Sequence, residues 1–207
     1  MNTDGKPGNH SEQREYELKF MLLPDEYRYI DSTFTGKAVL QTNHYFDTHD
    51  FRLYNERKVI RLRQRENTNE LTVKTLKSKN SRAGVIDILE RTILIDGEEA
   101  DMLLSGEISI GMYLKAFTDI NTDGLSVIGR LETRRKRIML SRDLPEAELD
   151  ESRYLGITDH ELEWEISEKQ YENSLQILSK LGINPENRKS AQSKYGRLVS
   201  QILKGRL

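Results

Sequence analysis

The sequence predicts an α+β protein in which a closed antiparallel β-sheet encloses charged side chains and helices cover its outer surface. Three stretches carry this prediction, because each alternates charged and apolar residues with the period of two that is typical of a β-strand. Two are acidic, at residues 15–20 and 161–166, and one is basic, at residues 59–65. In each stretch the apolar residues share one face and the charged residues share the other. Burying the apolar faces under helices turns the charged faces towards one another inside the sheet.

Like charges at this density are costly unless they hold a ligand. Three ionised carboxylates spaced two residues apart repel one another, and a bound cation removes that repulsion. Hard divalent cations such as Mg²⁺ take oxygen ligands, commonly a few carboxylates together with substrate phosphates. Guanidinium and ammonium groups suit phosphate oxygens. The acidic and basic strands therefore predict a divalent cation opposite a polyanion. The ordinary alternative for any one of these strands is a half-buried strand whose charged face meets solvent.

Composition limits the class of protein. With 207 residues the chain is long enough for one domain with a sizeable core. We expect a disordered extension at residues 1–13, which lack apolar content, and a single domain at 14–207. The absence of cysteine excludes disulfides and thiolate chemistry. No apolar run reaches the roughly 18 residues of a membrane span, and no signal peptide is evident, so we expect a cytoplasmic protein with no membrane partner.

Start, stop and turn signals predict the other elements of the first two thirds of the chain. Pro24 with Asp25 and Glu26 predicts a helix start, because proline suits the first turn and acidic residues suit its positive end. Residues 67–69 predict a hairpin turn, which lets Lys74 point to the same side as the arginines. The expected elements are a helix ending near residue 34, a strand at 43–48, a helical turn at 51–56, a polar loop at 77–84, a strand at 86–95, and short helices at 98–106 and 108–117.

A second basic strand is expected at residues 127–140. Its phase is ambiguous, because the run of four basic residues at 134–137 occupies both faces. If Ile138 and Leu140 are the outward apolar pair, Arg135 and Arg137 point inside. A solvated basic edge strand is the alternative.

Two helices are expected near the end of the chain. Ser167 and Gln170 have the spacing of a capping box, for a helix that stops at Gly182. A last helix is expected at residues 186–203. Its polar face belongs either to the site or to the surface, and it carries Lys189, Lys194 and Arg197.

With these residues in view, the chain resembles the CYTH family of triphosphate tunnel metalloenzymes. The family's Glu-x-Glu-x-Lys signature falls at Glu15, Glu17 and Lys19. The resemblance spans residues 14–197, and the polar extension before the signature is longer than usual. It continues through residues 45–48, Arg61 and Arg63, Lys74, Glu90, and the Glu-x-Glu pair at Glu161 and Glu163.

The resemblance implies an eight-stranded antiparallel barrel whose tunnel binds a triphosphate with one or two divalent ions, Mg²⁺ or Mn²⁺. The implied metal ligands are Glu15, Glu17, Glu161 and Glu163, with Asp150 and Glu90 as additions. The implied substrate ligands are Lys19, Arg61, Arg63, Arg65, Lys74, Arg135, Arg137, Lys189 and Lys194. The residues expected to act in catalysis are Lys19, Arg61, Arg63, Lys74 and Glu163. Glu165 receives no role.

The function implied is metal-dependent hydrolysis of a triphosphate, most simply inorganic tripolyphosphate. Three alternatives on the same scaffold stay open: a nucleoside triphosphatase, a thiamine triphosphatase and a class IV-type adenylate cyclase. The chain is also similar to polyphosphate polymerase domains, which usually work with membrane machinery.

The alternative from another class is a non-catalytic module that binds polyphosphate or a nucleotide, which could lack the metal carboxylates that this chain has. A nucleic-acid partner is not expected, because the net charge is only −2 and such binders show a broad basic surface. A homodimer is left open.

Overall fold

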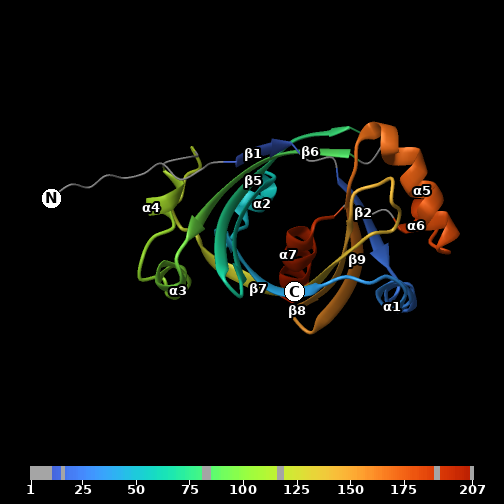
Figure 1. The fold of residues 1–207 in the computed structure, drawn as a ribbon. Helices are drawn as coiled ribbons and strands as arrows, with labels where there is room; N and C mark the ends of the chain where they lie inside the picture. Colours follow the sequence, from blue (N-terminus) through green and yellow to red (C-terminus); the bar gives the residue numbers. More distant parts are fainter. Residues whose placement is uncertain (1–10, 15–16, 81–84, 116–118, 189–191, 206–207) are drawn as a thin grey trace.

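Nine antiparallel strands form one strongly curved sheet in the computed structural model, which describes residues 11–14, 17–80, 85–115, 119–188 and 192–205 (Figure 1). The strand order is β1-β6-β5-β4-β3-β7-β8-β9-β2. The strands are β1 Ser11–Arg14, β2 Glu17–Leu22, β3 Ala38–Asp47, β4 Lys58–Arg65, β5 Thr68–Asn80, β6 Val85–Ile95, β7 Ser126–Ile138, β8 Ala147–Tyr154 and β9 Ile157–Glu165.

Helices connect the strands and cover the sheet. The described helices are α1 Pro24–Thr33, α2 Arg52–Asn55, α3 Gly97–Ser105, α4 Gly111–Leu114, the 3₁₀ helix Glu168–Gln170, α5 Tyr171–Lys180, α6 Pro185–Arg188 and α7 Lys194–Lys204. Within the described segments, none of these helices has the length and apolar character needed to cross a membrane.

The described hydrogen-bonded ladder has two edges, so the prediction of a closed, eight-stranded barrel is not confirmed. The edges are β1 and β2, which are neighbours in the chain. Three peptide steps join Arg14 to Glu17, and at 3.8 Å per step the Cα atoms of these two residues lie within about 11 Å of each other. β1 begins at Ser11, so residues 11–13 belong to the sheet and not to a disordered extension. Residues 1–10 of that extension lie outside the described residues.

Outward-facing apolar residues form two cores under the helices, as the alternating patterns predict. Leu162 and Trp164 of β9 belong to a core that includes α1 and α5. Ile60 and Leu62 of β4 belong to a second core with α3 and α4. Each large apolar side chain buried this way stabilises the fold by roughly 1.5–3 kcal/mol. These two cores fix which face of each strand carries charge.

A third core lies on the opposite, concave face of the sheet, where α7 sits inside the curve (Figure 1). Its approach to β7 requires a glycine, because a Cβ at Gly129 would lie 2.8 Å from Leu198 Cδ2. Tyr195 of α7 donates its hydroxyl hydrogen to the buried carboxylate of Asp47. The residues of this core include Tyr45, Leu131, Tyr154, Tyr195, Leu198 and Val199.

Several local predictions differ from the structure. The expected loop at 77–84 is strand through Asn80, and residues 81–84 lie outside the described residues. β8 was not predicted as a strand. The expected last helix at 186–203 is two helices, α6 and α7, and residues 189–191 between them are not described. α7 starts after Ser193, whose side chain accepts a hydrogen bond from the Gly196 amide. That cap fixes Lys194 as the first helical residue.

Candidate active site

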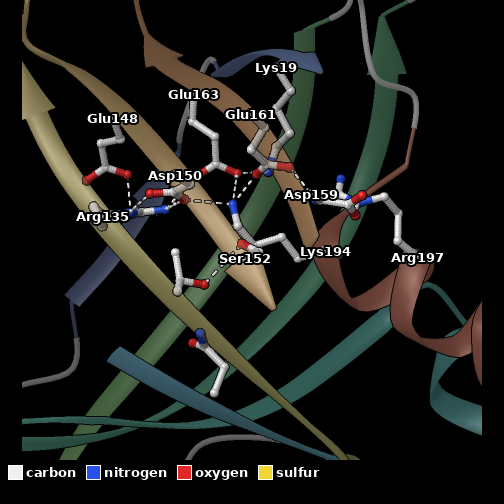
Figure 2. A network of polar contacts seen from close by, with 12 residues as sticks. Lys19, Arg135, Glu148, Asp150, Ser152, Asp159, Glu161, Glu163, Lys194 and Arg197 are labelled. Carbon is white, nitrogen blue, oxygen red and sulfur yellow. Dashed lines mark hydrogen bonds and ion pairs between the residues drawn. The ribbon is translucent and has the colours of Figure 1, made fainter. Parts of the chain in front are cut away.

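Three buried carboxylates meet on the concave face of the sheet, where β8 and β9 lie side by side. Asp150 is opposite Glu161 in the ladder, and Glu163 is two residues further along β9. The exposed fractions are 0% for Asp150, 1% for Glu161 and 6% for Glu163. One oxygen from each carboxylate lies within 4.8 Å of the others. We refer to Asp150, Glu161 and Glu163 as the acidic trio (Figure 2).

A lysine from α7 lies in the middle of the acidic trio. Lys194 Nζ is 2.8 Å from Asp150 Oδ2 and 2.9 Å from Glu163 Oε1, and it also contacts Glu161 Oε1. Figure 2 shows this ammonium group facing all three carboxylates. On β2, Lys19 Nζ lies 2.7 Å from Glu163 Oε1. The trio is therefore bound by cations from both ends of the chain.

Two arginines surround the same carboxylates. Arg135 of β7 donates from Nε and Nη2 to Asp150, at 2.9 and 2.6 Å, and from Nη2 to Glu163 at 2.7 Å. It also forms an ion pair with Glu148. Arg197 of α7 donates from Nε to Asp159 Oδ2 at 2.8 Å and pairs with Glu161. Arg197, Glu148 and Asp159 thus belong to the charged network of the site.

Burial and these cations act in opposite directions on the acids. Burial alone would raise the pKa of Glu163, but Lys19, Lys194 and Arg135 outweigh it and hold the pKa well below its usual range. Lys194 and Arg135 likewise overcome burial to lower the pKa of Asp150. The pKa of Glu161 is raised, because burial and the nearby Glu163 exceed the effect of Lys194.

The acidic trio fits a hard divalent cation. Its donors are all carboxylate oxygens, they converge from two adjacent strands, and they are buried enough to exclude most water. Oxygen donors of this kind suit Mg²⁺ and Mn²⁺ better than softer metals. The protein has no cysteine thiolate that would favour a softer ion.

The basic strands β4 and β5 carry a second group of charges. Arg61 Nη2 lies 3.8 Å from Glu90 Oε1 of β6, and Lys74 forms an ion pair with the same glutamate. These two cations outweigh burial and lower the pKa of Glu90. Glu90 was expected as an additional metal ligand. It lies instead beside Arg61 and Lys74, and among the described residues it is not part of the acidic trio.

Arg63 is a half-buried cation without a carboxylate partner among the described residues. Its Nε donates to Asn43 Oδ1 at 3.0 Å. Burial, followed by repulsion from Arg61 and Arg135, lowers the pKa of Arg63 to about 9. Two further donors nearby in the sheet, Arg61 Nε and Gln41 Nε2, are buried and have no hydrogen-bond partner in the part of the chain that the structure describes. An anion would accept hydrogen bonds from such unsatisfied donors.

The remaining predicted site residues lie elsewhere or are not described. Arg65 pairs with Glu70 at 2.9 Å. The Arg137 side chain is 65% exposed and lies 3.4 Å from Glu148, so only Arg135 of that pair is enclosed. Glu15 and Lys189 lie outside the described residues, and Glu17 is described only as a position in β2, opposite Glu165. Glu165 is exposed.

The phase of β7 resolves the ambiguity of its basic run. Arg135 points to the concave face. Arg134 and Lys136 point outward, where they bind Asp31 of α1 at 3.2 and 3.1 Å. The predicted phase is therefore confirmed for Arg135, because Ile138 is buried in the outer core.

Sequence reasoning missed Glu148 and Asp159 as members of the network, and it left Arg197 open between the site and the surface. The period-two pattern of β8 contained the signal for Glu148, which shares a face with Asp150. Arg197 follows Lys194 by three residues, a spacing that places both on one side of a helix. Asp159 shares a face of β9 with Glu161.

The comparisons with known proteins agree with this geometry. The sequence profile of the CYTH domain matches residues 13–193. YjbK of Bacillus subtilis (strain 168), a protein named for triphosphatase activity, is 28% identical over 161 residues, which are 76% of this chain and 80% of YjbK.

Two solved structures have the same fold. The Bacillus halodurans protein bh2851, described as an adenylate cyclase, has a TM-score of 0.73 and 28% identity, over 90% of this chain and 97% of its own. HpAC1 from Hippeastrum, for which a dominant triphosphatase activity is described, has a TM-score of 0.74 and 24% identity, over 90% and 96%. The CYTH profile matches most of the length of this chain, which also has the fold and the charged concave face described above. The chain belongs to the CYTH domain family.

Proposed function

We propose that this protein is a divalent-metal-dependent triphosphatase that hydrolyses inorganic tripolyphosphate within the curve of its sheet. The observation that carries the proposal is the pairing, on one concave face, of a buried acidic trio with a half-buried guanidinium, Arg63, that has no carboxylate partner among the described residues. Membership of the CYTH family and the likeness to YjbK, named for triphosphatase activity, support triphosphatase chemistry in general. We further propose that the edges β1 and β2 complete a tunnel around the substrate.

The basic residues would bind and orient the substrate. Arg61, Arg63 and Lys74 would hold phosphate oxygens from one side, and Lys19 and Arg135 from the other. Arginine and lysine make strong charge-assisted hydrogen bonds to phosphate. Because phosphoryl transfer depends mainly on positioning and on stabilising charge, these contacts would supply much of the rate enhancement.

Asp150, Glu161 and Glu163 would hold the metal ion, with Glu15 and Glu17 as additional proposed ligands. When bound, Mg²⁺ or Mn²⁺ would neutralise phosphate charge and lower the pKa of a water molecule. In the reaction, a water oxygen bonds to the terminal phosphorus and the bridging P–O bond breaks. The products are orthophosphate, diphosphate and a proton.

An adenylate cyclase is the second candidate, because bh2851, at 28% identity, is described as one. It would use the same cations and metal ligands, and would form a bond from the ribose 3′-oxygen to the α-phosphorus while diphosphate leaves. The two functions differ in product, so one assay separates them.

The test is phosphate release from tripolyphosphate, ATP, thiamine triphosphate and longer polyphosphate, each with Mg²⁺ or Mn²⁺, with cyclic AMP measured in parallel. We expect fastest release from tripolyphosphate and none without metal. Glu163→Gln should lower the metal-stimulated rate by at least about 100-fold, because it removes a ligand charge and keeps the shape. The matched control on the same strand is the exposed Glu165→Gln, which should stay within about twofold of wild type. Full activity in Glu163→Gln would refute the proposal.

A further inference from the structure

The ammonium group of Lys194 occupies the position that a divalent ion would need. It contacts one oxygen of each carboxylate in the acidic trio, at 2.8 Å for Asp150 and 2.9 Å for Glu163, with Glu161 as the third. Metal–oxygen distances are shorter, about 2.0–2.1 Å for Mg²⁺. An ion bound among the same oxygens would therefore overlap the ammonium group and repel it. The trio can hold Lys194 or a metal ion at its centre, but not both.

Of the cations around the trio, Lys194 is the one that contacts all three carboxylates, so it is the one that an ion at their centre would displace. Lys19 is paired with Glu163 at the side of the trio, and Arg135 is held by two hydrogen bonds to Asp150 and one to Glu163. Lys194 is the first residue of α7, with a flexible four-carbon stem. Rotation about that stem moves the ammonium group away from the carboxylates without moving the helix backbone.

The helix itself is anchored independently of Lys194. Tyr195 donates to the buried carboxylate of Asp47 and stacks on Tyr45, with ring centroids 5.0 Å apart. Leu198 packs on Gly129. α7 can thus stay docked when Lys194 leaves the trio.

We propose that Lys194 is an exchangeable internal cation, which balances the acidic trio in the metal-free protein and is displaced from it when a divalent ion binds. The inference rests on the metal site of the proposed function. It deepens that proposal, because the affinity for the metal ion is then set by competition between the ion and the Lys194 ammonium group. The displaced ammonium group remains on the concave face, where it becomes available to a phosphate oxygen. Metal and triphosphate then favour each other's binding.

The first test measures Mn²⁺ affinity without substrate, by electron paramagnetic resonance of the free ion. Lys194→Met should tighten Mn²⁺ binding by at least about tenfold, because the competing ammonium group is gone. Arg197→Met is the matched control. It removes the same charge from the same helix, next to Glu161, but from the edge of the trio. We expect the gain in Mn²⁺ affinity to be at least about threefold smaller than in Lys194→Met, because Arg197→Met changes the electrostatic field at the trio but frees no position at its centre.

Each outcome of this test has one meaning. Equal affinities for wild type and Lys194→Met, or equal gains in the two variants, would overturn the exchange and leave the metal site standing. Absence of Mn²⁺ binding from wild type and from a folded Lys194→Met would overturn the metal site, and the exchange with it. Binding by Lys194→Met with none by wild type would support both.

A second measurement uses the wild-type protein and covers the case in which Lys194→Met does not fold. Anomalous diffraction from crystals grown with Mn²⁺ should place the ion among Asp150, Glu161 and Glu163, with Lys194 Nζ no longer in contact with all three. An ion in the trio with Lys194 still contacting all three carboxylates would overturn the exchange. Crystals without an anomalous peak at the trio would overturn the metal site.

Discussion

Replacement of Arg63 by methionine should make the protein more stable and less able to bind a triphosphate. Burial and neighbouring arginines lower the pKa of Arg63 from 12.5 to about 9. At about 1.36 kcal/mol per pKa unit, keeping Arg63 charged in the folded state costs up to about 5 kcal/mol. Screening by solvent reduces that cost, and the variant also loses the hydrogen bond to Asn43, of about 1 kcal/mol. We expect a net stabilisation of about 1–3 kcal/mol at pH 7.

The pH dependence of this stabilisation has a definite sign. Because the folded pKa of Arg63 lies below the unfolded one, its cost is fully present below about pH 9 and diminishes as the pH rises towards 12.5. Urea unfolding at pH 7 and pH 10 measures the effect. The advantage of Arg63→Met over wild type should be smaller at pH 10.

The same variant should bind tripolyphosphate about 10- to 150-fold more weakly, the worth of one charge-assisted hydrogen bond. Calorimetry without added metal measures that affinity and avoids hydrolysis. The matched control is Arg134→Met, which removes an arginine on the outer face that pairs with Asp31 and Tyr27. It should lose up to about 1 kcal/mol of stability and keep anion affinity. If Arg63→Met is less stable than wild type and binds tripolyphosphate equally well, the reasoning is refuted and Arg63 is a structural residue.

Two further predictions concern the charges and packing around the site. Glu90→Gln should lower the free energy of unfolding at pH 7, because the lowered pKa of Glu90 contributes stability above its unfolded value of 4.5. The stability difference between the variant and wild type should shrink as the pH falls below that value. Urea titrations measure it, and a difference that does not change with pH would contradict the pairing of an ionised Glu90 with Arg61 and Lys74. Gly129→Ala should lower the free energy of unfolding by about 1–3 kcal/mol, because the new Cβ would meet Leu198. In the control Gly97→Ala the new Cβ meets nothing within 4 Å, so stability should change by less than about 0.5 kcal/mol. Equal melting temperatures for the two variants would show that α7 adjusts freely.

The period-two alternation was enough to predict the faces of the site strands. A strand has only two faces. Once Leu162 and Trp164 are assigned to the outside, Glu161 and Glu163 must therefore point inward. In the same way, outward Ile60 and Leu62 imply inward Arg61 and Arg63. The run at 134–137 was harder, since either phase buries charge. The contacts of Asp31 with Arg134 and Lys136 resolve it, and they depend on where α1 packs.

What alternation could not supply was the partners across the fold. Glu90 and Glu163 look alike in sequence, yet one lies among cations from β4 and β5 and the other in the acidic trio. Lys194 and Arg197 lie on an amphipathic helix whose polar face ordinarily meets solvent. Their burial follows from α7 lying inside the curve of the sheet, an arrangement that no local pattern encodes (Figure 1).

The contacts of the site join residues that are far apart in the chain. Lys19 and Glu163 are separated by 144 positions, and Asp47 and Tyr195 by 148. Closing loops of that length is entropically expensive, and topologies dominated by distant pairings fold slowly. The core under α3 and α4 can gather from nearer segments, since its buried residues lie between Phe46 and Leu114, but the charged network exists only when β2, β9 and α7 have all come together. A refolding chain should therefore regain the part of its sheet from β3 to β6 before it regains its chemistry.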